Sequence, residues 1–315
     1  MTVWIVFIIV VIAFLMLDLG VFNREAHVIS VKEASIWTSV WVSLALLFSI
    51  LVFYIYNNEW IANPEGLKPA NAALKYITGY LVELSLSVDN IFVIAVIFSS
   101  FSIPQKFQHR VLFWGILGAI IFRASMIFFG VALVNSIHWV IYIFGAFLLF
   151  TAFKMLRSEE EEEFDPKTSF VYRMVRKIFP VTATVDSQAF FVKRKYLTAA
   201  TPLFITLIII EITDVLFALD SIPAVIGITT DPFLVFSSNI LAILGLRSMY
   251  FFLANMLQKF QALKYSLVVI LSFVGIKLIL THHIKFPEWL SLSVIFVSLF
   301  AGIAYSYLKK DNKEA

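Results

Sequence analysis

The chain contains 315 residues, of which 61% are hydrophobic and only 14% are charged. Soluble domains carry about 25% charged residues, so this composition indicates an integral membrane protein, and we expect one membrane domain over residues 1–315. The chain has no cysteine, which excludes disulfides, thiolate metal ligands and cysteine catalysis. Any metal site would therefore use oxygen or imidazole ligands.

Nine apolar segments have close to the ~20 residues that cross a bilayer as a helix. They lie at about 2–22, 34–56, 73–100, 110–134, 137–156, 198–228, 232–257, 264–281 and 288–308. The sequence therefore predicts an all-α membrane protein with about nine transmembrane helices.

Most lysines and arginines fall on one side of the predicted membrane, chiefly in the segment of about 157–197 and after the last span. Cytoplasmic loops carry an excess of basic residues. We therefore expect a multi-pass protein of the plasma (inner) membrane, with its N-terminus outside and its C-terminus in the cytoplasm. The acidic run from Glu159 to Glu163 is typical of a solvated linker, and a weak collector of divalent cations is the alternative interpretation.

Two predicted spans each contain more than one carboxylate, although each carboxylate costs at least ~2.5–3.5 kcal/mol on insertion scales. The third span contains Glu83 and Asp89, and the sixth contains Glu211, Asp214 and Asp220. Acidic residues at this depth mark ion paths, proton relays or internal salt bridges. With Asp18 of the first span, six acids are set against four bases within the spans, and one divalent cation would neutralise the formal excess of two negative charges. Protonation of the acids would have the same effect.

Pro223 predicts a break in the sixth span, because its ring clashes with the preceding turn and it has no N–H to donate. Broken helices occur at membrane depth where they line a cavity. We expect this break to turn Asp220 inward. In the third span, Glu83, Ser87 and Asn90 recur at helical spacing on one face. These side chains supply oxygen atoms, which suit Mn²⁺, Ca²⁺ or Mg²⁺.

Two stretches of the chain repeat the same pattern of acids. The spacing from Glu83 to Asp89 equals that from Asp214 to Asp220, and a small polar residue and isoleucine follow each second acid. Further along, the repeated basic residues are Arg123 and Lys154 in the first stretch and Arg247 and Lys277 in the second. We interpret this as a duplication of about 73–156 in about 198–281.

The proposed duplication relates spans three, four and five to spans six, seven and eight. A step of three helices is odd, so the two repeats would have opposite orientations in the membrane. Inverted repeats of this kind are typical of transporters, with the site at the repeat interface near the midplane.

The motifs around these acids resemble those of the TerC family, and are closest to its Alx branch. The resemblance is carried by residues 79–83, 88–90, 211–218, 220–224 and 243–247, and similarity runs over nearly the whole chain. Members of this family are integral membrane proteins associated with manganese export, metalation of exported enzymes and tellurite resistance. The resemblance therefore implies export of Mn²⁺ as cargo, with no resident cofactor. The chain departs from related sequences at Leu84 and Thr213, where lysine and serine are frequent.

The acidic motif of the family falls on residues that we expect to coordinate the metal, namely Glu83, Asp89, Asn90, Glu211, Asp214 and Asp220. Residues expected to support these ligands are Arg123, Arg247, Ser87 and Ser221. For the two arginines, purely structural ion pairing is the alternative interpretation. Rocking of one repeat against the other would open the site to each side in turn, and protonation of an acid would release the metal.

Two other functions remain open. The first keeps the fold but transports another cation, such as Ca²⁺, sodium or a proton. The second is a non-transporting membrane scaffold for the response to metal or tellurite stress, with binding in the segment of about 157–197. An enzyme is not expected, since the Gly-x-Gly-Asp element of intramembrane aspartyl proteases is absent. The expected partners are the lipid bilayer, a divalent metal ion, and secretion-machinery or metalation proteins, with no nucleic acid.

Overall fold

The computed structural model describes residues 2–20, 29–137, 139–157, 173, 177, 180, 182, 189–194, 197–254, 263–280, 284 and 286–311. Within these ranges the helices are α1 (Thr2–Gly20), α2 (Val31–Asn57), α3 (Pro69–Ser100), α4 (Gln105–Ser136), α5 (Val140–Arg157), α7 (Pro202–Ile226), α8 (Pro232–Ala254), α9 (Leu263–Leu280) and α10 (Glu288–Asp311). Their bounds lie within a few residues of the predicted spans. Both the acidic run at 159–163 and most of the segment 157–197 lie outside the described residues.

Within the described ranges, six helices are both long enough and apolar enough to cross a membrane, namely α2, α3, α4, α5, α7 and α8. Shorter apolar helices lie within α1, α9 and α10. Large apolar side chains such as Phe128 and Phe129 are exposed on the outside of the bundle, as expected for a surface in lipid. The chain is therefore a nearly all-helical integral membrane protein with several apolar helices.

Several of these helices start at capping residues or prolines, which are typical of helix N-termini. Ser30 caps α2 by accepting a hydrogen bond from the Glu33 N–H at 3.2 Å, which is half of a capping box. Asp231 caps α8, since its Oδ1 accepts from the N–H groups of Phe233 at 3.0 Å and Leu234 at 3.3 Å. Helices α3, α7 and α8 each start with proline, whose missing N–H is not needed in a first helical turn.

The predicted break at Pro223 is absent from the structure. Helix α7 continues through this proline to Ile226, and the Gly227 N–H donates to the Pro223 carbonyl at 2.9 Å. The proline lies less than two turns from the end of the helix, so the lost hydrogen bond affects only the last part of α7. Asp220 therefore keeps the direction that a continuous helix gives it.

A β-hairpin corrects the all-α expectation. Strands β1 (Phe191–Arg194) and β2 (Leu197–Ala200) pair antiparallel, with Phe191 opposite Ala200. The predicted sixth span began at residue 198, but helix α7 begins only at Pro202. The residue before a proline is biased towards extended backbone, and Thr201 adopts that conformation.

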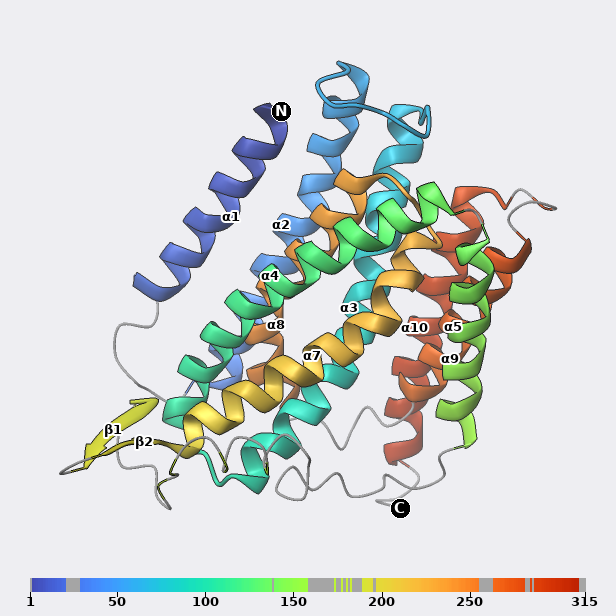
Figure 1. Cartoon of the computed structure of the whole chain (residues 1–315). Helices are drawn as coiled ribbons and strands as arrows, with labels where there is room; N and C mark the ends of the chain where they lie inside the picture. The colour runs from blue at the N-terminus through green and yellow to red at the C-terminus, as the bar shows by residue number, and fades with distance from the viewer. Residues whose placement is uncertain are drawn as a thin grey trace.

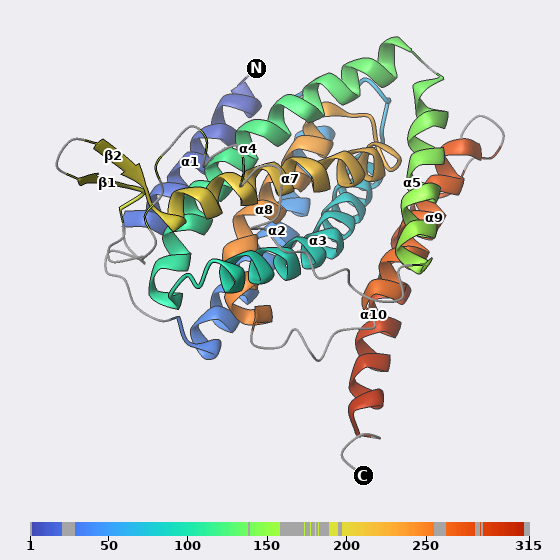
Figure 2. The same ribbon diagram turned by 60° about the horizontal axis from the view of Figure 1, so that its bottom comes forward.

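The helices carrying the predicted acids pack directly together. Helices α4 and α7 run side by side, and both are in contact with the bundle of α2, α3 and α8 (Figure 1). Helices α5, α9 and α10 lie to one side of that bundle (Figure 2). Buried apolar side chains from α3, α4, α7 and α8 contribute to the core around the polar residues described below.

Close contact between α5 and α9 depends on two glycines. A Cβ atom added to Gly145 would lie 2.9 Å from the Gly275 carbonyl oxygen, and one added to Gly275 would lie 2.9 Å from the Gly145 carbonyl oxygen. Small residues of this kind let transmembrane helices approach backbone to backbone, where van der Waals packing stabilises the pair. Helices α5 and α9 therefore form a tightly packed pair.

Candidate functional site

Arg123 connects three helices at the centre of the bundle. Its side chain is fully buried on α4. Towards α7, its Nε donates to Asp214 Oδ2 at 3.1 Å and its Nη2 donates to Asp214 Oδ1 at 2.8 Å, which is a bidentate ion pair. Towards α3, its Nη1 donates to Glu83 Oε1. We call Arg123, Glu83, Asp214 and Asn90 the arginine cluster.

Asn90 completes this cluster from α3. With its amide oriented to satisfy its hydrogen bonds, the oxygen accepts from Arg123 Nη2 at 3.3 Å and the nitrogen donates to the Leu86 carbonyl at 3.2 Å. The predicted face of α3 is therefore confirmed in that both Glu83 and Asn90 meet the same arginine. Two buried oxygens on this face, Glu83 Oε2 and Ser87 Oγ, have no hydrogen-bond partner within the described ranges.

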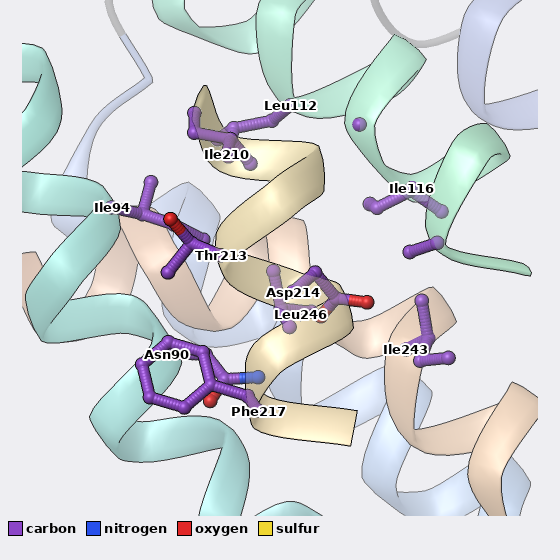
Figure 3. A pocket seen from close by; sticks show the side chains of 12 residues that line it. Asn90, Ile94, Leu112, Ile116, Ile210, Thr213, Asp214, Phe217, Ile243 and Leu246 are labelled. Carbon is purple, nitrogen blue, oxygen red and sulfur yellow. The ribbon is translucent and has the colours of Figure 1, made fainter. Parts of the chain in front are cut away.

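A small cavity adjoins the arginine cluster (Figure 3). Its volume is about 20 Å³, which is enough for one water molecule. Asn90 and Asp214 supply polar atoms to its wall, and apolar side chains such as Phe217 and Leu246 supply most of the rest. Thr213 also lines it, but its hydroxyl donates to the Ile209 carbonyl at 2.7 Å. The cavity thus brings carboxylate and amide oxygens to a space of atomic size.

Glu211 lies one turn before Asp214 and is packed against α4. A methyl group on Gly118 would overlap the Glu211 carboxylate, so only glycine leaves room for this carboxylate in its present position. Glu211 Oε2 is buried and has no hydrogen-bond partner among the residues that the structure describes. Sequence reasoning identified Glu211 but missed Gly118, because a glycine in an apolar helix carries no chemical signal of its own.

Asp220 faces a different part of the molecule. Its Oδ1 accepts a hydrogen bond from Thr151 Oγ1 of α5 at 3.2 Å, and Lys154 adds positive charge nearby. Within the described part of the chain, Asp220 makes no hydrogen bond or ion pair with Arg123. The structure therefore brings Glu83, Asn90 and Asp214 together, and places Asp220 at the contact between α7 and α5. Sequence reasoning missed Thr151, which had only its nearness to Lys154 as a signal.

The other predicted residues are placed as follows. Asp89 belongs to α3, but its side chain lies outside the described residues. Arg247 of α8 is buried and has interaction partners, and Ser221 of α7 is buried with no hydrogen-bond partner for its hydroxyl in the described ranges. Among the residues whose placement is described, no group of three or more His, Asp or Glu side chains is arranged to hold a metal ion.

A second polar cluster, not anticipated from the sequence, lies at one end of the bundle. Glu65 Oε1 accepts from Thr229 Oγ1 at 3.0 Å, from Thr230 Oγ1 at 2.8 Å and from the Thr230 N–H, while Oε2 pairs with Lys75 at 2.7 Å. Burial alone would raise the pKa of Glu65, but the Lys75 ammonium and the Thr230 hydrogen bonds outweigh it and lower that pKa. Nearby, burial raises the pKa of Asp231, and hydrogen bonds to its carboxylate offset this only in part.

Comparison with known proteins identifies the family. The model described as "Integral membrane protein TerC family" matches residues 68–314. The chain belongs to the TerC family. It is 49% identical to "Uncharacterized membrane protein STKORF319" of Myxococcus xanthus, over 98% of this chain and 93% of the relative. It is 45% identical to "Putative membrane-bound redox modulator Alx" of Escherichia coli (strain K12), over 93% of this chain and 90% of the relative.

A further relative, "Uncharacterized membrane protein" of Rickettsia bellii (strain RML369-C), is 42% identical over 98% of each chain. No solved structure matches the chain. The resemblance to the TerC family and its Alx-like members is therefore confirmed.

Proposed function

We propose that this TerC protein exports a divalent metal ion from the cytoplasm across the plasma membrane, and that this ion is Mn²⁺. The supporting observation is the arginine cluster, which lies near the middle of α3, α4 and α7. One guanidinium faces two carboxylates there, so the group carries a net negative charge if both are ionised. A buried charge must be balanced by a proton or a cation.

The chemistry of the ligands favours a hard cation. Carboxylate and amide oxygens of Glu83, Asp214 and Asn90 are near one another, and no imidazole or thiolate accompanies them within the described ranges. Oxygen ligands suit Mn²⁺, Ca²⁺ and Mg²⁺. Manganese is chosen from this group on the basis of the family motifs, and Ca²⁺ is the alternative cargo.

Arg123 takes the place of the cargo in the present arrangement. Its guanidinium occupies the oxygens of Glu83 and Asp214 that a metal ion would need. Entry of a cation would displace Arg123 from at least one of these acids. When the cation leaves, the ion pairs with Arg123 would form again. Because an unpaired buried charge is strongly unfavourable, the arginine keeps the empty site stable.

The contacts between helices support alternating access by inverted repeats. Helix α3 packs on α8, α4 packs on α7, and α5 packs on α9. If α3, α4 and α5 are exchanged with α7, α8 and α9, the α3–α8 pair and the α4–α7 pair change places and the α5–α9 pair is unchanged. This is the pattern expected of two repeats, about 73–156 and about 198–281, related by a twofold axis.

The proposed orientation places the N-terminus outside and the C-terminus in the cytoplasm. The start of α1 and the end of α10 lie at opposite ends of the bundle (Figure 1), as an odd number of crossings requires. The basic residues of the segment 157–197 and of the C-terminal end would then be cytoplasmic.

Manganese accumulation tests the proposal in cells that lack their own manganese exporters. We would compare the unmodified chain with Asp214→Asn, Asp89→Asn and Asp220→Asn at equal expression, with Ser125→Ala on the exposed face of α4 as the control. Lower internal manganese with the unmodified chain and Ser125→Ala, but not with Asp214→Asn, supports export. Equal manganese in every strain rejects manganese export, and the same comparison with calcium then tests the alternative cargo.

A further inference from the structure

A larger cavity lies at the end of the bundle that carries the loop between α2 and α3 and the turn between α7 and α8. Its volume is about 610 Å³, within the ~300–1,000 Å³ of typical small-molecule sites. It shares no lining residue with the cavity beside Arg123. We call it the end chamber.

Among the residues that the structure describes, the charged residues lining the end chamber are Glu65, Lys75 and Lys277, and these three sum to a net positive charge. The Glu65 carboxylate is already engaged, since Oε1 accepts from Thr229 and Thr230 and Oε2 pairs with Lys75. A cation entering the chamber would therefore meet two ammonium groups and a carboxylate whose oxygens are in use. The charge of the wall suits an anion.

Lys277 is the best-placed group to bind such an anion. It lines the chamber and is buried, and its Nζ donates to Ser291 Oγ at 3.1 Å. An ammonium group has three donors, so it can serve more than one acceptor. Asp231 is not among the residues that line the chamber, and its Oδ1 accepts a hydrogen bond from the Phe233 N–H in the first turn of α8.

Part of the lining of the end chamber is apolar. Phe286, Pro287 and Trp289 line it, and Trp289 and Ile284 are exposed at the end of the bundle. A ligand that fits both the charged and the apolar parts of this lining has a negative group beside hydrocarbon. The helix ends lie where phospholipid headgroups surround a membrane protein, so phosphate esters are the anions present in greatest amount there.

We propose that the end chamber binds an anionic phosphate group through Lys277 and Lys75. The source is either the headgroup of an anionic phospholipid, whose hydrocarbon would lie on the Trp289 side, or free phosphate. This site is separate from the arginine cluster and does not depend on which ion the protein exports.

Binding is measured on the purified full chain with two probes. In nanodiscs, phosphatidylglycerol is added to a phosphatidylcholine background and retained lipid is quantified by native mass spectrometry. In phosphatidylcholine alone, inorganic phosphate is titrated and the thermal unfolding midpoint is followed. If phosphatidylglycerol is retained but phosphate does not raise the unfolding midpoint, the ligand is a lipid headgroup. If phosphate raises the midpoint but phosphatidylglycerol is not retained, the ligand is free phosphate. Absence of both effects overturns the proposal.

Variants test the assigned residues. Lys277→Gln is expected to weaken binding roughly tenfold, because a charge-assisted hydrogen bond is lost, and Lys277→Arg is expected to restore it. Lys68→Gln, an exposed residue before α3 that does not line the chamber, makes the same change of charge and should leave binding unchanged. Equal binding by Lys277→Gln and the unmodified chain contradicts the proposal.

Glu65→Gln gives a test that does not rely on loss of binding. It removes the negative charge from the chamber while leaving an amide oxygen to accept hydrogen bonds from Thr229 and Thr230. Anion binding should become tighter, which a merely misfolded variant would not show. Weaker phosphate binding by a folded Glu65→Gln protein would overturn the proposal that the chamber binds an anion.

Discussion

Arg123 and Asp214 form a bidentate ion pair between the middles of α4 and α7, at 2.8 and 3.1 Å. The same guanidinium binds Glu83 of α3, so one side chain holds three helices at the level where the acids lie. A bidentate pair requires both charge and a fixed orientation. Any event that moves α7 relative to α4 must therefore break or rebuild this contact.

Removal of Arg123 should destabilise the protein. Arg123→Ala would leave Glu83 and Asp214 without their charge partner, and such losses cost about 3–5 kcal/mol for a buried pair. Thermal unfolding of the purified protein measures this, and Arg123→Lys should give an intermediate midpoint because it keeps the charge but loses the planar fork. An unfolding midpoint unchanged by Arg123→Ala would mean that these acids are not held by Arg123.

Energetic coupling should distinguish Asp214 from Asp220. Asp214 contacts Arg123, whereas Asp220 contacts Thr151 on α5. Double-mutant cycles of unfolding free energy should show an interaction of about 0.5–3 kcal/mol between Arg123→Gln and Asp214→Asn. The cycle of Arg123→Gln with Asp220→Asn should be additive within about 0.5 kcal/mol. Equal coupling in both cycles would place the two aspartates in one network, contrary to the structure.

Substitution of Gly118 should displace Glu211. In Gly118→Ala the added methyl overlaps the carboxylate, so we expect manganese export to fall even though α4 keeps its helical propensity. The double variant Gly118→Ala with Glu211→Asp shortens the acid by one methylene and should recover part of the lost export. Failure of Gly118→Ala to change either export or stability would show that Glu211 rearranges freely.

The Glu65–Lys75 pair should make stability depend on acid pH. The folded protein lowers the pKa of Glu65, so this group stabilises the fold above its ordinary pKa of about 4.3 and the contribution disappears as pH falls through the lowered value. Glu65→Gln should therefore reduce the fall in thermal midpoint on acidification below about pH 4.5. Glu59→Gln, at an exposed position of the same loop, is the control, and an identical acid response in both variants would contradict the prediction.

Hydropathy was sufficient to locate the helices to within a few residues, but it did not predict the exceptions. Proline at the start of α3 and α8 and the Ser30 cap of α2 act within one turn, so the sequence places these ends closely. The break expected at Pro223 did not occur, because a proline near a helix end interrupts few hydrogen bonds that the helix still needs. The hairpin at β1 and β2 was missed because each strand has only four residues and shows no regular alternation of apolar and polar side chains.

The sequence by itself determined that this is a multi-helix membrane protein with buried acids, since hydropathy over a span and the cost of a carboxylate in hydrocarbon are local properties. The motifs that resemble the TerC family surround these same acidic residues in the sequence. Only the tertiary structure decided that Arg123 pairs with Glu83 and Asp214 while Asp220 turns to Thr151. Those partnerships depend on the rotation and spacing of packed helices, and contacts such as the one between Gly118 and Glu211 help to define that packing.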